Sequence, residues 1–169
     1  ASDLKGVKWR AYSPATARIA ELVGAQPVTV QAAEVSQAFA TGLAESMISS
    51  GSTGWDAKLH EHVKYWYDTQ AWLPKNAVLI NKAAFDGLDG PTKQALLKAA
   101  ADAEVRGWAA SKVANTDSLD KLKANGMNIL PPPATLTADM KKVGDTMLKE
   151  WLEKAGPEGK QLVDAFNAK

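Results

Sequence analysis

The amino-acid sequence predicts an α/β protein, with a short and mostly parallel sheet flanked by helices and a long helical region toward the C-terminus. Two observations lead to this prediction. Over the first fifty residues, short runs rich in β-branched and aromatic residues alternate with segments of helical periodicity, as in strands joined by helical crossovers. After residue 90, small and apolar residues recur every three or four positions over more than thirty residues, which indicates a long helix.

The first half of the chain is predicted to begin with a strand at residues 7–12 and a helix at residues 14–23. Ser13 is a favoured N-cap, Pro14 suits the first helical position, and Gly24 is typical of a helix end. A strand at 27–30, a helix at 32–41 and a strand at 45–49 follow. This order predicts a parallel sheet.

The stretch from Ser49 to Trp55 is rich in glycine and hydroxyl side chains. It has neither the spacing and lysine of a P-loop nor the Gly-x-Ser-x-Gly motif of a nucleophile elbow. Two interpretations stay open. The stretch is either a turn that caps a helix predicted over residues 56–65, or a ligand loop at the same edge of the sheet as Arg10.

The second half contains the longest predicted element. A continuous apolar run, Val78-Leu79-Ile80, predicts a buried strand within residues 76–81, and a helix over residues 92–125 follows it. That helix would be about 50 Å long, against a diameter of about 40 Å for a compact domain of this length, and would act as a strut. A strand at 127–130 and helices at 136–154 and 157–167 complete the chain.

These elements divide the chain into three parts. They are a ligand-binding lobe at 1–75, a crossover strand with the long helix at 76–125, and a C-terminal strand with helices that pack back at 126–169.

Composition excludes several classes of function. The net charge is +1 and the charges are interspersed, which argues against nucleic acid or an anionic membrane as the main partner. There is no cysteine, so disulfide scaffolds, thiolate metal sites and cysteine nucleophiles are excluded. His60 and His62 do not have the spacing of a zinc-binding helix. We therefore expect no metal, no cofactor and no catalytic residue.

Arg10 is the clearest candidate for a binding residue. It lies near the carboxyl end of the first predicted strand, where parallel sheets bind ligands, and just before a helix N-terminus, which attracts anions. Its planar guanidinium matches a carboxylate. The stretch therefore predicts an anion site, with a carboxylate as the simplest anion. The alternative is a surface arginine that precedes a helix by chance.

Several segments resemble the solute-binding proteins of tripartite ATP-independent periplasmic (TRAP) transporters. The stretch from Asp3 to Arg10 is similar to the family's DLKGxKxR entry into its second lobe. Residues 22–27 resemble its LGAxP segment, and residues 34–42 resemble its EVYxALQxG helix. Residues 78–88 resemble the strand and turn before its long helix, so the resemblance covers essentially the whole chain.

The resemblance implies a periplasmic-binding-protein-like, two-lobed fold that closes over a small organic acid in the periplasm and delivers it to the subunits of a TRAP membrane permease, without catalysis. It implies that Arg10 binds the substrate carboxylate. Ser49 and Val30 stand where many members carry an asparagine and an aromatic residue, so sialic acid or dicarboxylate specificity does not transfer.

Further ligand contacts are expected around Arg10. The helix capped by Ser13 would offer N–H donors, and Ser50, like Ser49, would offer a hydroxyl. Tyr12 and Trp55 would form an apolar wall, and together with Trp9 at the same rim they suggest a substrate with an apolar or aromatic part.

The family has a first lobe, whereas the resemblance here begins at the entry into the second. We therefore expect the chain to be the C-terminal part of a longer protein, with the N-terminal lobe missing. Val78-Leu79-Ile80 would then lack sheet partners. We expect an exposed apolar edge, strand exchange between copies in a homo-oligomer, or a rearrangement of this region.

Two other functions stay open. One is an α/β enzyme that acts on a carboxylate substrate, although the sequence shows no paired carboxylates, nucleophile with a base, or metal cluster at meaningful spacing. The other is an interaction domain that uses the same scaffold without a small ligand.

Overall fold

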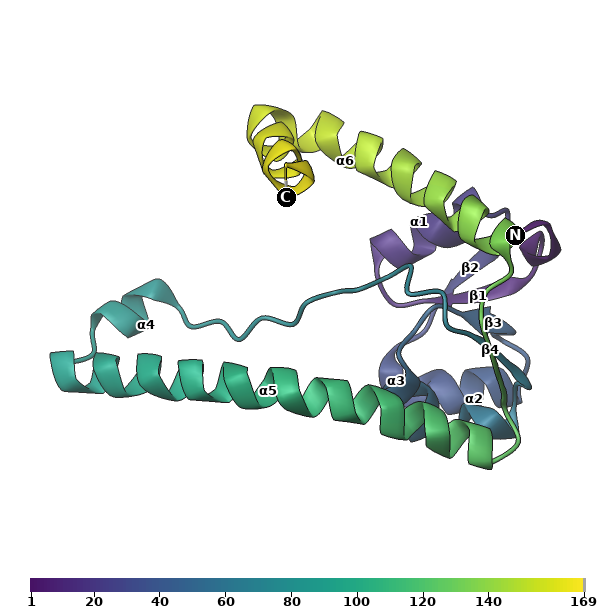
Figure 1. Ribbon diagram of the computed structural model, residues 1–169, viewed down its shortest axis with the longest axis horizontal. Helices are drawn as coiled ribbons and strands as arrows, with labels where there is room; N and C mark the ends of the chain where they lie inside the picture. The colour runs from purple at the N-terminus through teal and green to yellow at the C-terminus, as the bar shows by residue number, and fades with distance from the viewer. Residues whose placement is uncertain (169) are drawn as a thin grey trace.

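The computed structural model describes residues 1–168, in which a small α/β body carries two long helices (Figure 1). The helices and strands are β1 (Lys8–Ala11), α1 (Pro14–Leu22), β2 (Gln26–Thr29), α2 (Val35–Ala40), β3 (Ser46–Met47), α3 (Gly51–Asp56), β4 (Tyr65–Tyr67), α4 (Lys82–Asp86), α5 (Gly90–Ala124), β5 (Asn128–Leu130) and α6 (Ala134–Asn167). Short 3-10 turns lie at Ser2–Leu4, Ala32–Glu34 and Leu59–Glu61. The predicted α/β class is confirmed.

Two parallel sheets organise the body. The first has the strand order β2-β1-β3, and in it Arg10 pairs with Val28 on one side and Met47 on the other. The second pairs β4 with β5, so it joins the chain before α4 to the chain after α5. Because the strands of the first sheet are parallel, their carboxyl ends meet at one edge.

Local sequence features explain where the helices begin. The hydroxyl of Ser13 accepts a hydrogen bond from the Thr16 backbone N–H (3.2 Å), and the Thr16 hydroxyl accepts one from the Ser13 N–H (3.0 Å), which forms a capping box. At α5, Asp89 accepts from the N–H of Thr92 (2.8 Å). These bonds satisfy N–H groups that have no partner inside the helix.

The body has two hydrophobic cores on the two faces of the first sheet. The first core lies under α2, α3 and the end of α5 and consists of Val30, Val35, Ala38, Phe39, Ala44, Leu59, Leu122 and Met127. The second lies between β1, α1 and α6 and consists of Trp9, Ile19, Ala20, Ala25 and Val143. Trp9 and Arg10 are neighbours in β1, so they point to opposite faces.

Helix α5 is long and mostly solvent-exposed. It has 35 residues, so it is about 50 Å long, and every residue from 94 to 117 is exposed. Only its C-terminal end packs against the body, and α4 lies at its far end (Figure 1). The predicted long helix is present, and its role as a strut between two lobes stays a prediction.

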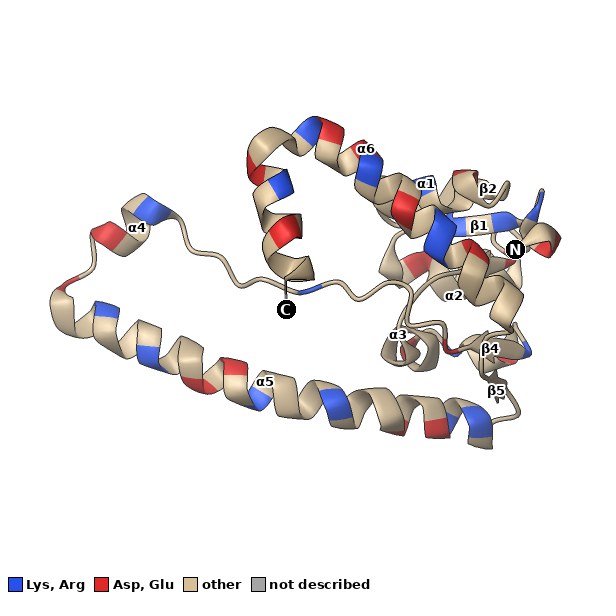
Figure 2. Ribbon diagram, turned by 45° about the horizontal axis from the view of Figure 1, so that its top comes forward, with Lys and Arg blue, Asp and Glu red and all other residues tan. Residues whose placement is uncertain are grey.

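Charges of both signs are interspersed along α5 and α6 (Figure 2). Several of them form ion pairs four residues apart, such as Lys98–Asp102 on α5 and Lys141–Asp145 on α6. Such pairs support helices that bury little surface, by a few tenths of a kcal/mol each. No helix within residues 1–168 carries an apolar stretch long enough to cross a membrane.

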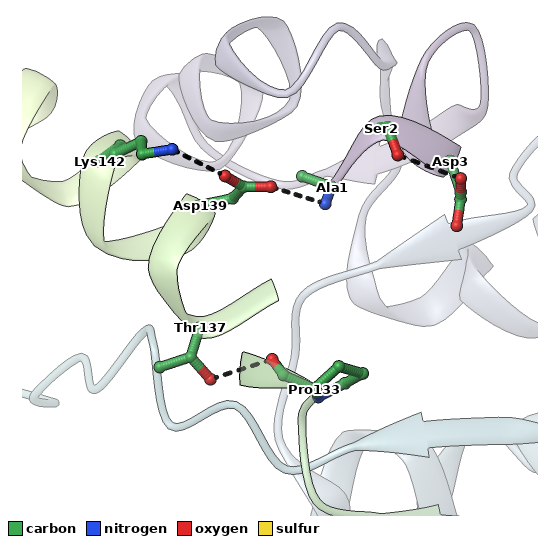
Figure 3. Close-up of polar contacts among 7 residues, drawn as sticks. All are labelled: Ala1, Ser2, Asp3, Pro133, Thr137, Asp139 and Lys142. Carbon is green, nitrogen blue, oxygen red and sulfur yellow. Dashed lines mark hydrogen bonds and ion pairs between the residues drawn. The ribbon is translucent and has the colours of Figure 1, made fainter. Parts of the chain in front are cut away.

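Helix α6 starts beside the first residues of the chain (Figure 3). The carboxylate of Asp139 accepts hydrogen bonds from the Ala1 ammonium (3.0 Å) and from Nζ of Lys142 (3.2 Å). At Gly156 the backbone adopts φ +62° and ψ −152°, which interrupts the helix. The two helices predicted at 136–154 and 157–167 are therefore confirmed as the two halves of α6.

The predicted strand at residues 76–81 is wrong. No helix or strand forms between residues 68 and 81, and Val78 and Leu79 are 104% and 87% exposed. A strand needs a neighbour to satisfy its backbone groups, and the described residues provide none here. The apolar residues 78–80 are exposed, as expected, but they form no strand and therefore no sheet edge. A strand-exchanged homo-oligomer is not supported.

The helix predicted at residues 56–65 is also wrong. A short helix, α3, ends at Asp56 instead, and Lys58 adopts the left-handed conformation (φ 52°), which breaks any continuation. The Ser50 hydroxyl accepts from the N–H of Thr53 (3.1 Å) and caps α3. The stretch from Ser49 to Trp55 thus contains a capping turn and the helix that it starts, and its role as a ligand loop stays a prediction.

Candidate functional site

Arg10 is held at the carboxyl edge of the first sheet. Its side chain is only 3% exposed, and its Nε donates a hydrogen bond to the Val30 carbonyl oxygen (2.8 Å) just beyond β2. The guanidinium carbon lies 4.8 Å from the centre of the Tyr12 ring, a cation–π contact. Burial lowers the pKa of Arg10 below its ordinary value, but an arginine keeps its charge in proteins.

The Arg10 guanidinium retains unused donors. Within residues 1–168, its only hydrogen bond is the one from Nε, and no carboxylate forms an ion pair with it. Arginine has five N–H donors in a fixed fork, so the two terminal nitrogens carry N–H groups that have no partner within residues 1–168. A buried positive charge without an anion is costly, and a carboxylate would satisfy it with two parallel hydrogen bonds.

Tyr12 connects Arg10 to a distant segment. Its hydroxyl accepts a hydrogen bond from Nε1 of Trp72 (2.9 Å), and its backbone N–H donates to the Thr16 hydroxyl (3.0 Å). Sequence reasoning missed this role of Trp72. The sequence marks Trp72 only as one of six tryptophans. Trp72 is sixty residues away from Tyr12 and lies in an irregular segment, so no local pattern connects the two residues.

Two candidate residues contribute differently from expectation. Val30 offers its backbone carbonyl to Arg10, while its side chain is buried in the first core. The Ser13 hydroxyl is already engaged with Thr16 in the capping box of α1. Both residues therefore shape the surroundings of Arg10 through the backbone and the helix start.

The other candidates lie farther along the chain. Ser49 is half-buried just after β3, at the edge where Arg10 lies, and Ser50 caps α3. The Trp55 ring stacks on His60 (centroids 5.5 Å apart) and lies 5.6 Å from Nζ of Lys121 on α5. Trp55 is thus engaged between α3 and α5, and its role as a wall for a ligand stays a prediction.

Trp9 does not lie at the ligand rim. It is 4% exposed and belongs to the second core, on the sheet face opposite Arg10. The suggestion that it faces a substrate is wrong because alternation along β1 directs it to the other face. Tyr12 is the aromatic residue that contacts Arg10.

An apolar hollow of about 200 Å³ lies between α1 and α6. Ile19, Trp72, Val143 and Met147 are among the residues that line it. It adjoins the second core, and Trp72 also faces Tyr12 through its indole N–H. The described residues include no group of three acidic or histidine side chains that could hold a metal ion.

Comparison with known proteins identifies the family. The family model for bacterial extracellular solute-binding proteins, family 7 (DctP), matches residues 1–155. DctP6, an extracytoplasmic solute receptor of Bordetella pertussis that binds pyroglutamic acid, is 58% identical with a TM-score of 0.96, over 99% of this chain and 56% of that one. A marine metagenome TRAP solute-binding protein specific for pyroglutamate is 41% identical with a TM-score of 0.94, over 99% and 55%.

A curated relative agrees. The 2,3-diketo-L-gulonate-binding periplasmic protein YiaO of Escherichia coli K12 is 29% identical over 173 residues, which cover 98% of this chain and 50% of YiaO. The chain thus spans about half the length of the proteins that it matches. Members of the matched family are extracytoplasmic transport receptors, not enzymes. The chain therefore belongs to the bacterial extracellular solute-binding proteins of family 7, the solute receptors of TRAP transporters.

Proposed function

We propose that this chain carries the carboxylate-binding site of a periplasmic TRAP receptor, which captures a small organic acid and passes it to a membrane permease without changing it. The observation that supports this most directly is the state of Arg10. Its charge is buried, its orientation is fixed by the Val30 carbonyl and the Tyr12 ring, and no acidic side chain within residues 1–168 neutralises it. A bound carboxylate would complete this arrangement.

The proposed ligand is pyroglutamate. Three receptors that are 58%, 41% and 44% identical to this chain are described as binding it. Pyroglutamate is a five-membered lactam that carries one carboxylate. Arg10 would bind the carboxylate, the Tyr12 ring would contact the apolar part of the lactam, and Ser49 and Ser50 would supply hydroxyls to its polar atoms.

The exposed surface supports a second lobe in the complete receptor. The chain exposes 11867 Å², against about 8,000 Å² for a compact monomer of 18.0 kDa. Much of the exposed apolar surface lies on residues 73–80, α5 and α6. We propose that a second lobe covers part of this surface and contributes the other wall of the ligand cleft.

The experiment that tests the site is a titration of the ¹⁵N-labelled chain with pyroglutamate, followed by NMR. This method detects weak binding, so it suits a chain that carries one wall of a cleft. We expect saturable shifts at the Arg10 Nε–H and at the Tyr12 amide. Arg10→Gln should abolish them, and Arg106→Gln, which changes an exposed arginine on α5, should not.

The amide of pyroglutamate serves as the matched ligand control, because it keeps the lactam and lacks the carboxylate. It should cause no saturable shift at Arg10. If pyroglutamate itself produced no saturable shift up to its solubility limit, or if Arg10→Gln bound it as the unaltered chain does, the proposed site would be wrong.

A further inference from the structure

Trp72 is an isolated anchor in an otherwise exposed segment. From Gln70 to Ala84, it is the one side chain that is partly shielded from solvent, and every other residue in this range is exposed. Its indole ring packs against the second core, and its Nε1–H points to the hydroxyl of Tyr12 at 2.9 Å. The irregular segment is therefore joined to the body where the Arg10 site begins.

Two contacts in series, Trp72 to Tyr12 and Tyr12 to Arg10, link Trp72 to the charge of Arg10. The indole N–H of Trp72 holds the Tyr12 hydroxyl, and the Thr16 hydroxyl holds the Tyr12 backbone N–H, so both ends of the tyrosine are fixed. The fixed ring then faces the Arg10 guanidinium at 4.8 Å. The Val30 carbonyl restrains the same guanidinium through Nε. The position of the Arg10 guanidinium thus depends on the position of the Tyr12 ring.

We infer that Trp72 is a positioning residue of the carboxylate site, which acts through Tyr12 and touches no ligand atom itself. The inference rests on the proposed function of Arg10. A binding group that is already held in the bound geometry loses less entropy when the ligand arrives. Without the indole N–H, the Tyr12 ring gains freedom, and the guanidinium loses a fixed cation–π partner.

The test uses Trp72→Phe, Tyr12→Phe and the double variant in the same pyroglutamate titration. Each single change removes the hydrogen bond but keeps a ring in place, so each should weaken binding by about three- to tenfold, the span that one neutral hydrogen bond covers. The double variant should bind pyroglutamate as tightly as the single variant with the lower affinity, because both changes remove the same Trp72–Tyr12 hydrogen bond. Trp108→Phe, at an exposed tryptophan of α5, should bind as the unaltered chain does.

A merely structural role would not give this pattern. Additive losses in the double variant, or unaltered binding by Trp72→Phe, would overturn the inference. Tyr12→Phe provides the same test if Trp72→Phe proves unstable, since it deletes one oxygen atom and leaves the indole packing unchanged.

A second readout separates this inference from the proposed function. In the ligand-free chain, the Arg10 Nε–H should exchange faster with water in Trp72→Phe and in Tyr12→Phe than in the unaltered chain. If pyroglutamate failed to bind at all, this exchange rate would still show whether Trp72 positions Arg10. Equal exchange rates in all three proteins would contradict the inference whatever the ligand does.

Discussion

Arg18 of α1 and Glu150 of α6 form a bidentate ion pair, with Nη2–Oε1 at 2.6 Å and Nε–Oε2 at 3.1 Å. A third contact joins Nη1 of Arg18 to Glu21 (2.8 Å) on its own helix. The hydrogen bonds from Arg18 hold the pKa of Glu150 below its ordinary value. This pair and the apolar packing around Val143 together fix where α6 crosses α1.

The ion pair predicts acid-dependent stability. The pKa of Glu150 is lower in the folded chain than in the unfolded chain, so the ion pair stabilises the fold at any pH above the pKa of Glu150 in the unfolded chain. This stabilisation is lost as the pH falls through the pKa of Glu150 in the folded chain. Glu150→Gln should lower the thermal unfolding midpoint at neutral pH, and the difference should vanish in acid. Glu153→Gln, on the same helix and without an ion pair in residues 1–168, is the matched control. An equal effect of both changes would refute the prediction.

Leu122 is predicted to be the main apolar anchor of α5. It is fully buried in the first core, so Leu122→Ala should lower the free energy of unfolding by about 2–5 kcal/mol through lost contacts and a cavity. Leu97→Ala, at a site 59% exposed on the same helix, should change it by less than about 0.5 kcal/mol. Urea denaturation measures both. Comparable losses would mean that the exposed part of α5 packs against something in solution.

Two helical glycines should respond in opposite directions to alanine. A Cβ at Gly54 would lie 3.3 Å from Cδ1 of buried Leu122 and 3.4 Å from the Trp66 ring, so Gly54→Ala should lower the free energy of unfolding by about 1–3 kcal/mol. A Cβ at Gly107 would meet open space, so Gly107→Ala should raise it by about 0.5–1 kcal/mol through helix propensity. Urea denaturation of the two variants measures both changes. A higher free energy of unfolding for Gly54→Ala would show that α3 and α5 are loosely packed.

The apolar residues 78–80 are predicted to add nothing to the stability of this chain. Leu79→Ser should leave the free energy of unfolding within about 0.5 kcal/mol, because the side chain is 87% exposed. The same change should reduce the binding of a hydrophobic dye such as ANS. A large loss of stability would mean that the segment is packed in solution, by a second copy or by a rearrangement of the chain.

The sequence predicted elements well where their causes are local. The alternation through Trp9 and Arg10 and the Ser13-Pro14 helix start depend on neighbouring residues, so the strand, the helix and the place of Arg10 at the sheet edge could be predicted. Residues 78–80 could not be predicted in this way. Their composition favours a strand, but a strand also needs a partner, and composition does not show whether one is present.

The remaining differences have similar physical reasons. The helix predicted over residues 56–65 does not form, because the cap at Ser50 starts α3 earlier and Lys58 ends it. The hydrogen bond that orients Arg10 is accepted by the backbone oxygen of Val30, and the identity of the Val30 side chain does not predict it. The bond from Trp72 to Tyr12 joins residues sixty positions apart, and no local pattern predicts such a pairing.

The exposure of α5 has a consequence for its motions. Between residues 94 and 117 the helix depends on its own backbone bonds and ion pairs, as an isolated peptide does, while Ser118 and Leu122 are buried in the body. Amide protons should therefore exchange with solvent at rates that fall steadily along the helix. Amide protons near Gly90 should exchange through local fraying of the helix, and those near Leu122 should exchange only when the α/β body unfolds. In this way a single uninterrupted helix would belong to two dynamic regimes.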